Sequence, residues 1–175
     1  MDHQPESTLL EFLRYNQWAN QTLLAVCQTL TEDQLAAPIP GAYGSIRATF
    51  RHLLRAEADY IGRITGARPE PPFRWEDTPS LQAQHDYAAQ LGQAILDVVQ
   101  RVPPTQNVHE EENGLWIEYQ ARQLFMQHII HGIEHRINIS THLNTLGVAL
   151  PEMDNWGYLF THGDRFALRE GRVGG

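Results

Sequence analysis

Histidines at helical spacing are the residues of this chain best suited to chemistry. Residues 128–136 read His-Ile-Ile-His-Gly-Ile-Glu-His-Arg, and a solitary histidine, His52, lies far upstream between Arg51 and Leu53. Imidazoles four residues apart project from one face of a helix, where they can bind a divalent metal ion. An ion with an open coordination position lowers the pKa of bound water, and can polarise a carbonyl group or hold a thiolate. A polar helix face that carries histidines and no ligand is the alternative interpretation.

Distance along the helix limits which histidines can share one ion. Because the rise is about 1.5 Å per residue, His128 and His135 stand roughly 10 Å apart along the axis. Zn–N bonds are only about 2.1 Å long, so the pairs that remain are His131 with His135 and His128 with His131. Either pair leaves a tetrahedral ion short of ligands, and His52 is the candidate third ligand from another helix. Its position opposite a leucine stripe faces either solvent or a polar cleft inside the bundle.

Apolar periodicity and capping residues predict the helices that would position these histidines. We expect four long helices, at about residues 7–30, 45–65, 78–102 and 119–146. Gly66 and Gly147 follow the second and the fourth of them as stop signals.

The connections between the helices complete the predicted architecture. The proline-rich residues 68–78 have the length of an overhand crossover, and Asn113-Gly114 predicts a small hairpin within 107–119. A short terminal helix is expected within 154–168. The fold class is therefore all-α, a four-helix bundle with a long crossover connection. We expect one domain over residues 1–168, followed by a flexible C-terminal tail over 169–175.

Composition narrows the possible functions. The chain has 175 residues, a net charge of −8 and 13 basic residues, all of them arginine. The absence of lysine excludes Schiff-base chemistry and a P-loop, and the acidic balance argues against nucleic-acid binding. The single cysteine, Cys27, allows no intrachain disulfide and favours a cytoplasmic location. No signal peptide or membrane-spanning run is found, so no membrane partner is expected.

Three blocks of sequence resemble the DinB/YfiT-like bundle proteins, a family regarded as metal-dependent enzymes. Residues 15–20, Tyr-Asn-Gln-Trp-Ala-Asn, are similar to the family's aromatic-Asn-x-Trp-Ala-Asn opening, and residues 52–57, His-Leu-Leu-Arg-Ala-Glu, to its His-Leu-x-x-Ala-Glu segment. Residues 131–136, His-Gly-Ile-Glu-His-Arg, resemble its His-x-x-x-His-Arg segment, and the chain then continues into a similar Leu-Gly-x-x-Pro-x-x-Asp exit. The likeness covers nearly the whole chain in order. One departure is Ile137, where many members have glycine.

The resemblance implies a site and a partner. The family's metal triad falls on His52, His131 and His135, with His128 as a neighbour and not a ligand. The metals implied are nickel or zinc, one ion per chain, and the partner implied is a second copy in a homodimer.

The site and the resemblance together predict a metal-dependent enzyme acting on a small molecule, in detoxification or stress response. One reading is hydrolysis, with Glu134 as candidate general base, although it lies about 60° from His131 and about 100° from His135 around the helix. The other is S-transfer from a low-molecular-weight thiol, as in some relatives. Arginines such as Arg51, Arg55 or Arg136 can bind substrate carboxylates. A non-catalytic metal-binding or dimerising bundle protein is the alternative.

Overall fold

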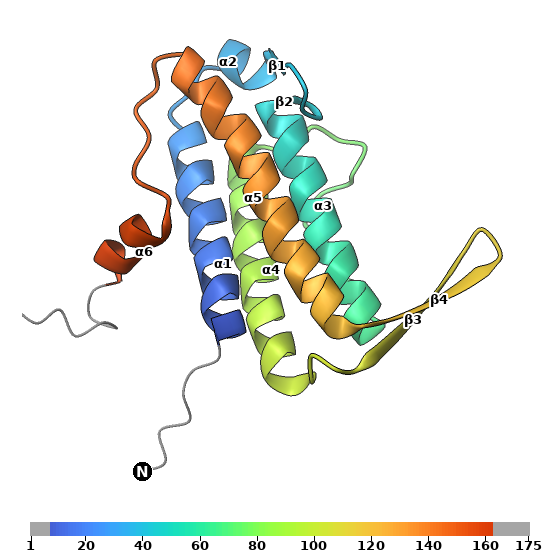
Figure 1. Cartoon of the computed structure of the whole chain (residues 1–175). Helices are drawn as coiled ribbons and strands as arrows, with labels where there is room; N and C mark the ends of the chain where they lie inside the picture. The colour runs from blue at the N-terminus through green and yellow to red at the C-terminus, as the bar shows by residue number, and fades with distance from the viewer. Residues whose placement is uncertain (1–7, 163–175) are drawn as a thin grey trace, which may run out of the picture.

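Four long amphipathic segments form helices that pack side by side (Figure 1). The computed structural model describes residues 8–162 of the chain. Its long helices are α1 (Thr8–Cys27), α3 (Ile46–Thr65), α4 (Leu81–Arg101) and α5 (Ala121–Thr145). The predicted all-α bundle is confirmed, with boundaries shifted by a few residues from those expected.

Each helix of the bundle packs against two others. Both α1 and α3 contact α4 and α5, so α1 and α3 lie on one diagonal of the bundle. The two helices that carry the histidines, α3 and α5, are therefore direct neighbours. They run in opposite directions (Figure 1).

Residues 66–80 connect α3 to α4 by running back along the bundle. Arg68 pairs with Asp59 near the end of α3 at 3.0 Å, and Arg47 near its start donates a hydrogen bond to the Pro79 carbonyl. The segment thus returns over the length of α3 before α4 begins. This is the overhand crossover that the sequence predicted, and it makes α3 and α4 parallel.

Capping residues set the ends of these helices. Ser45 caps α3 by accepting a hydrogen bond from the Ala48 amide, and Gly66 ends it with a left-handed φ of 76°. The start of α4 differs from the expectation: Ser80, rather than Thr78, is its N-cap, because the Ser80 hydroxyl accepts a hydrogen bond from the amide of Ala83.

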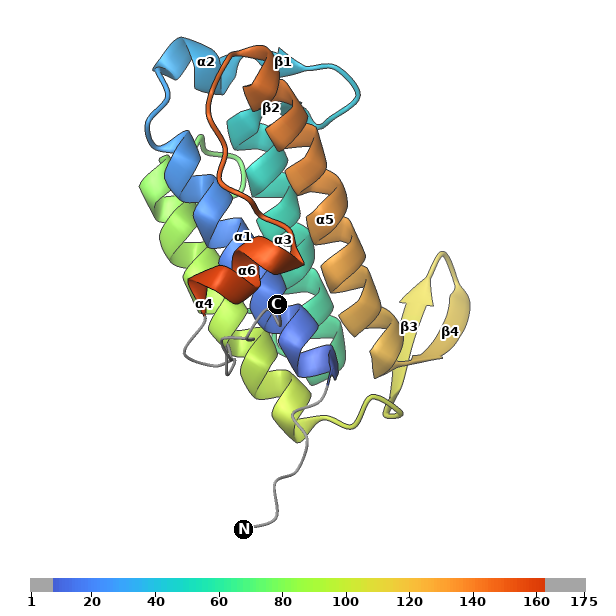
Figure 2. The same ribbon diagram turned by 60° about the vertical axis from the view of Figure 1, so that its left-hand side comes forward.

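Two small β-hairpins interrupt the helical pattern. Helix α2 (Glu32–Ala36), β1 (Pro38–Ile39) and β2 (Gly44–Ser45) lie at the end of the bundle where α3 begins. The second hairpin, β3 (Asn107–Glu112) and β4 (Leu115–Gln120), projects from the opposite end (Figures 1 and 2). Its turn has positive φ at Asn113 (54°) and Gly114 (77°), which is the conformation that an Asn-Gly pair favours.

Helix α6 (Asn155–Thr161) lies across α1 (Figure 2). The Tyr15 hydroxyl donates a hydrogen bond of 2.7 Å to the Met153 carbonyl and so attaches the segment that precedes α6 to α1. The expected terminal helix is thus present up to Thr161. Residues 163–168 and the predicted tail, 169–175, lie outside the described residues.

A continuous apolar core fills the bundle, with Phe50, Leu53 and Leu54 of α3 fully buried against Phe125 and Ile139 of α5. This packing fixes the relative position of the two histidine-bearing helices. Among residues 8–162, no helix is both long enough and apolar enough to cross a membrane.

Candidate metal centre

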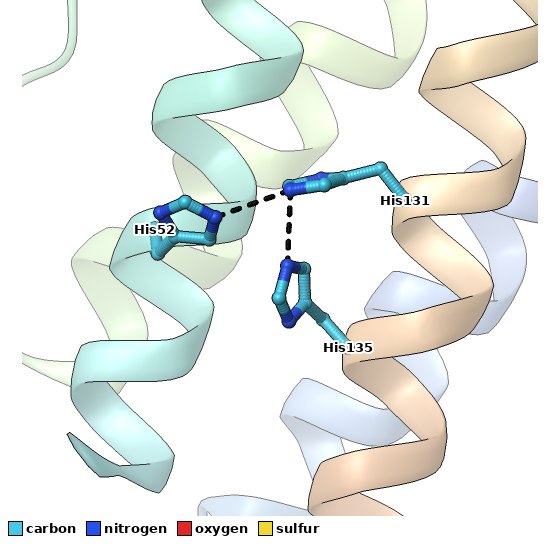
Figure 3. A group of neighbouring side chains, drawn as sticks. All are labelled: His52, His131 and His135. Carbon is cyan, nitrogen blue, oxygen red and sulfur yellow. Dashed lines mark hydrogen bonds between the residues drawn. The ribbon is translucent and has the colours of Figure 1, made fainter. Parts of the chain in front are cut away.

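Three imidazole rings converge between α3 and α5 (Figure 3). The Nε2 atom of His131 lies 3.1 Å from Nε2 of His52 and 2.9 Å from Nε2 of His135. One nitrogen from each ring falls in a group whose members all lie within 4.8 Å of one another. Two side chains come from successive turns of α5 and the third from α3.

Helix geometry explains the convergence. His131 and His135 are four residues apart and lie on the side of α5 that faces α3. His52 lies between the buried Phe50 and Leu53, whose packing fixes the rotation of α3. The half-buried His52 therefore lies against the two histidines of α5.

The surroundings of all three imidazoles favour their neutral form. Burial lowers the pKa of His131 to about 4, and the neighbouring His135 and His52 add to the effect. Burial also lowers the pKa of His52 and of His135, with His135 contributing to the shift of His52. Neutral imidazole is the form that coordinates a metal ion.

The spacing of the nitrogens fits a shared cation. Two ligand atoms about 2.1 Å from one ion lie about 3.0 Å apart at a right angle and about 3.4 Å apart at the tetrahedral angle. The observed separations of 2.9 and 3.1 Å are close to the first value. The buried Nδ1 atoms of His131 and His135 make no hydrogen bond within residues 8–162.

The other histidines of α5 do not join the group. His128 is buried on the same side of the helix, but its Nε2 atom lies 3.6 Å from a carboxylate oxygen of Glu57. His142 is half-buried nearer the end of α5. Glu134, the expected general base, is exposed and is not part of the clustered group, so its catalytic role stays a prediction.

A buried polar network next to the three histidines joins α1, α3 and α5. Arg136 donates hydrogen bonds of 2.7 and 2.6 Å to the side-chain oxygens of Asn16 and Asn20. Both asparagines in turn donate to the same oxygen of Glu57, each at 2.9 Å. Each of these four side chains is at most 4% exposed. The two asparagines thus connect the buried guanidinium of Arg136 to the buried carboxylate of Glu57. The network also orients Arg136, which directly follows His135.

Gly132 lets α1 and α5 approach closely enough to form this network. A Cβ atom at this position would lie 2.8 Å from Nη1 of Arg136 and would overlap the side-chain oxygen of Asn16. By contrast, Ile137, where the sequence departs from the resembling segment, is 58% exposed on the outer side of α5.

An aromatic side chain covers the open side of the histidine group. The Tyr43 ring, from the loop between β1 and β2, stacks on the His52 ring with centroids 3.5 Å apart and an angle of 10°. It also meets His135 edge-on, and Tyr60 of α3 meets His131 edge-on. Tyr43 itself is 58% exposed, so the histidines lie just beneath the surface.

Analysis of the sequence did not identify the network or the covering tyrosine as parts of the site. Asn16, Asn20 and Glu57 appear there only as letters of the resembling blocks, and Arg136 is expected there to bind a substrate carboxylate. Polar residues at positions 16 and 20 of an otherwise apolar helix were a usable signal, because buried polar groups require partners. Nothing in the sequence around Tyr43 indicates that it reaches His52.

A helical bundle with a crossover and three histidines between its second and last long helices defines a class of candidate metalloproteins. Within that class, the model of the DinB family matches residues 4–166, and the chain belongs to the DinB family. A solved DinB-like protein from Bacillus cereus has a similar fold, with a TM-score of 0.64 and 18% sequence identity. The match covers 82% of this chain and 93% of that one. A comparison with curated proteins finds no match.

Proposed function

We propose that the protein is a metal-dependent enzyme whose His52, His131 and His135 hold one divalent ion, nickel or zinc. The observation that carries the proposal is the convergence of three Nε2 atoms from two helices at 2.9 and 3.1 Å. Membership of the DinB family supports it. The lowered pKa values of the three imidazoles, which favour their neutral form, agree with a ligand role.

A bound ion would supply Lewis acidity to a small-molecule substrate or hold the sulfur of a thiol as thiolate. The chain contributes the positions of the groups around it. Tyr43 limits access to the histidines from one side, and Arg136 with its asparagine partners fixes the α5 segment that carries His135.

Two reactions fit this site, hydrolysis and S-transfer from a low-molecular-weight thiol, and both suit detoxification or a stress response in the cytoplasm. Hydrolysis requires a proton shuttle, and the candidate Glu134 is exposed. S-transfer needs no additional carboxylate base, because coordination itself stabilises the thiolate. The structure therefore favours the thiol transferase as the first activity to test.

A non-catalytic metal-binding bundle is the competing function. A non-catalytic metal-binding protein needs no substrate-binding groups next to the ion. Arg51, Arg55 and Trp75 lie together on the accessible side of His52, and this arrangement favours the enzyme.

Metal analysis of the protein purified without a histidine tag tests the site. We expect one nickel or zinc ion per chain, and near zero after replacement of His52, His131 or His135 by alanine. His85→Ala and His142→Ala, at half-buried histidines outside the group, should keep the full complement. Full metal content in the His52→Ala variant would overturn the triad.

The enzymatic part has a separate test. Metal-loaded protein is screened against thiols paired with electrophiles, and against esters and amides, with the His131→Ala variant as the blank. Turnover that requires both the metal and the triad supports the enzyme. A metal that raises the melting temperature strongly but supports no turnover in either screen supports the non-catalytic bundle.

A further inference from the structure

A small cavity opens on the surface beside His52. Its volume is about 210 Å³, and it is lined by Tyr43, Ala48, Arg51, His52, Arg55 and Trp75. Four of these side chains come from successive turns of α3, and the others from the β1–β2 loop and the crossover. Because His52 forms part of the wall, a molecule in the cavity lies next to the histidine group.

The cavity carries two positive charges without a matching acid. Arg51 donates one hydrogen bond, 2.9 Å, to the Asp77 carbonyl, and the Arg55 guanidinium lies 5.7 Å from the centre of the Trp75 ring. Within residues 8–162, neither arginine forms an ion pair with a carboxylate, and no acid lines the cavity.

The neighbouring arginines behave differently. Arg47 and Arg63, on the same helix, pair with Glu32 and Glu110 at 2.6 and 2.9 Å. Within residues 8–162 some arginines pair with carboxylates and others do not, so what distinguishes Arg51 and Arg55 is their position together at one cavity. Two guanidinium groups left unpaired at one cavity therefore leave a place for an external anion.

Aromatic rings bound the cavity on two sides. Trp75 is held by edge-on contacts with Phe73 and Tyr87, at centroid distances of 5.4 and 6.0 Å. Tyr43, which stacks on His52, also lines the cavity. Both rings offer an apolar surface to a flat organic group whose anionic end lies at the arginines.

We propose that this cavity binds the carboxylate or phosphate group of an anionic small-molecule substrate, held by Arg51 and Arg55. The anionic group anchors the molecule, and its reactive end extends past His52 towards the three histidines. Planar guanidinium groups match the geometry of either anion, and Trp75 and Tyr43 contact the adjoining carbon atoms. The assignment to a substrate depends on the proposed metal-dependent function, whereas binding of the anion does not.

Titration of the full-length, metal-free protein with matched probes tests the proposal. Benzoate, phenylphosphonate and the neutral benzamide are compared by calorimetry in a low-salt buffer. The indole N–H signal of Trp75, assigned with a Trp75→Phe variant, reports whether binding occurs in the cavity. We expect at least one of the two anions to bind and to shift this signal, while benzamide does neither. The better anion identifies the carboxylate or the phosphate class.

Charge-matched variants complete the design. Arg51→Gln and Arg55→Gln should each weaken the anion about tenfold or more, since a charge-assisted hydrogen bond is lost. Arg122→Gln removes the same charge from an exposed position on α5 and should leave the affinity unchanged. Equal binding of benzamide, no binding of either anion, or unaltered affinity in both cavity variants would overturn the proposal.

We expect anion binding in the cavity to be independent of the metal. His131→Ala, which removes a proposed ligand outside the cavity lining, should still bind the anion. Anion binding without any metal uptake by the wild-type protein would refute the proposed function alone. Metal uptake without anion binding would refute the inference alone.

Discussion

Glu57 and Arg136 are charged side chains that lie almost entirely within the bundle, at 2% and 4% exposure. Asn16 and Asn20 link them, so each charge keeps hydrogen-bond partners in the interior. A buried charge that loses its counter-charge is costly, by about 3–5 kcal/mol in comparable pairs. The network thus couples the stability of the fold to the segment next to His135.

Glu57→Gln should therefore lower the free energy of unfolding of the metal-free protein by about 3–5 kcal/mol, because Arg136 stays buried without an anion. Urea unfolding followed by circular dichroism measures the change. Glu111→Gln, at an exposed position of β3, is the matched control and should change the value by less than about 0.5 kcal/mol. Equal stability of the two variants would show that the network is not a stabilising element.

His128 gives the metal-free protein a dependence on pH. Burial lowers its pKa below the ordinary value of 6.5, despite the nearby Glu57 carboxylate, so the folded protein keeps it neutral where the unfolded chain takes up a proton. The contribution of neutral His128 to the free energy of unfolding is complete above pH 6.5 and decreases as the pH falls below 6.5.

We expect the free energy of unfolding, measured in the presence of a chelator, to fall between pH 7 and pH 5. His128→Gln should make this slope shallower, because the variant lacks the group that the unfolded chain protonates. An unchanged slope in His128→Gln would contradict the assignment.

At the scale of the elements, the contact between α1 and α5 depends on Gly132. Gly132→Ala should destabilise the protein by about 1–3 kcal/mol, since the added methyl group must displace Asn16 or separate the helices. Thermal unfolding with and without metal measures the effect. Gln123→Ala, at an exposed position of α5 outside the bundle interior, should cost far less. A neutral Gly132→Ala variant would mean that the network tolerates the displacement.

The elements were largely predictable because their signals are local. Caps such as Ser45 and stops such as Gly66 act within one turn, and the Asn113-Gly114 pair nearly determines its own turn. The start of α4 was misplaced because Thr78 and Ser80 are both able to cap a helix, and only the structure distinguishes which hydroxyl accepts the bond. The pairing of His52 with α5 rested on resemblance, since periodicity left two orientations open.

The network and the cavity were beyond local prediction. Asn16 and Arg136 are 120 residues apart, and their contact depends on the order in which the helices pack. Arg136 was grouped with Arg51 and Arg55 as a carboxylate ligand, yet the fold buries it and leaves the other two at the surface cavity. Residue type alone could not separate these roles.

At the scale of the whole molecule, an apolar stripe lies on the outer side of α5. Met126, Ile130, Ile133 and Ile137 are between 37% and 58% exposed. These four residues are separated by intervals of four, three and four residues, which match the spacing of a coiled-coil seam. The order of the intervals is the same from either end of the stripe. An antiparallel second copy would thus place Met126 against Ile137 and Ile130 against Ile133. In that register Glu134, the one acid of α5, has no acid opposite it.

We expect this stripe to form the interface of a homodimer. Light scattering after size exclusion should give twice the chain mass of 20.0 kDa for the wild type. Ile133→Asp should give a monomer, because it places a carboxylate at the centre of the stripe. Ile117→Asp, on the projecting hairpin, should remain dimeric. A monomeric wild type, or a dimeric Ile133→Asp variant, would contradict this interface.

The distance between His52 and His131 along the chain, 79 residues, determines when during synthesis the site can exist. A nascent chain that has emerged only as far as α4 presents a single imidazole of the three and cannot retain an ion. Uptake must therefore follow release of α5 from the ribosome and its docking on α3. A metal retained by this protein would report that α5 has been made and has docked on α3, and products truncated before His131 would be left without one.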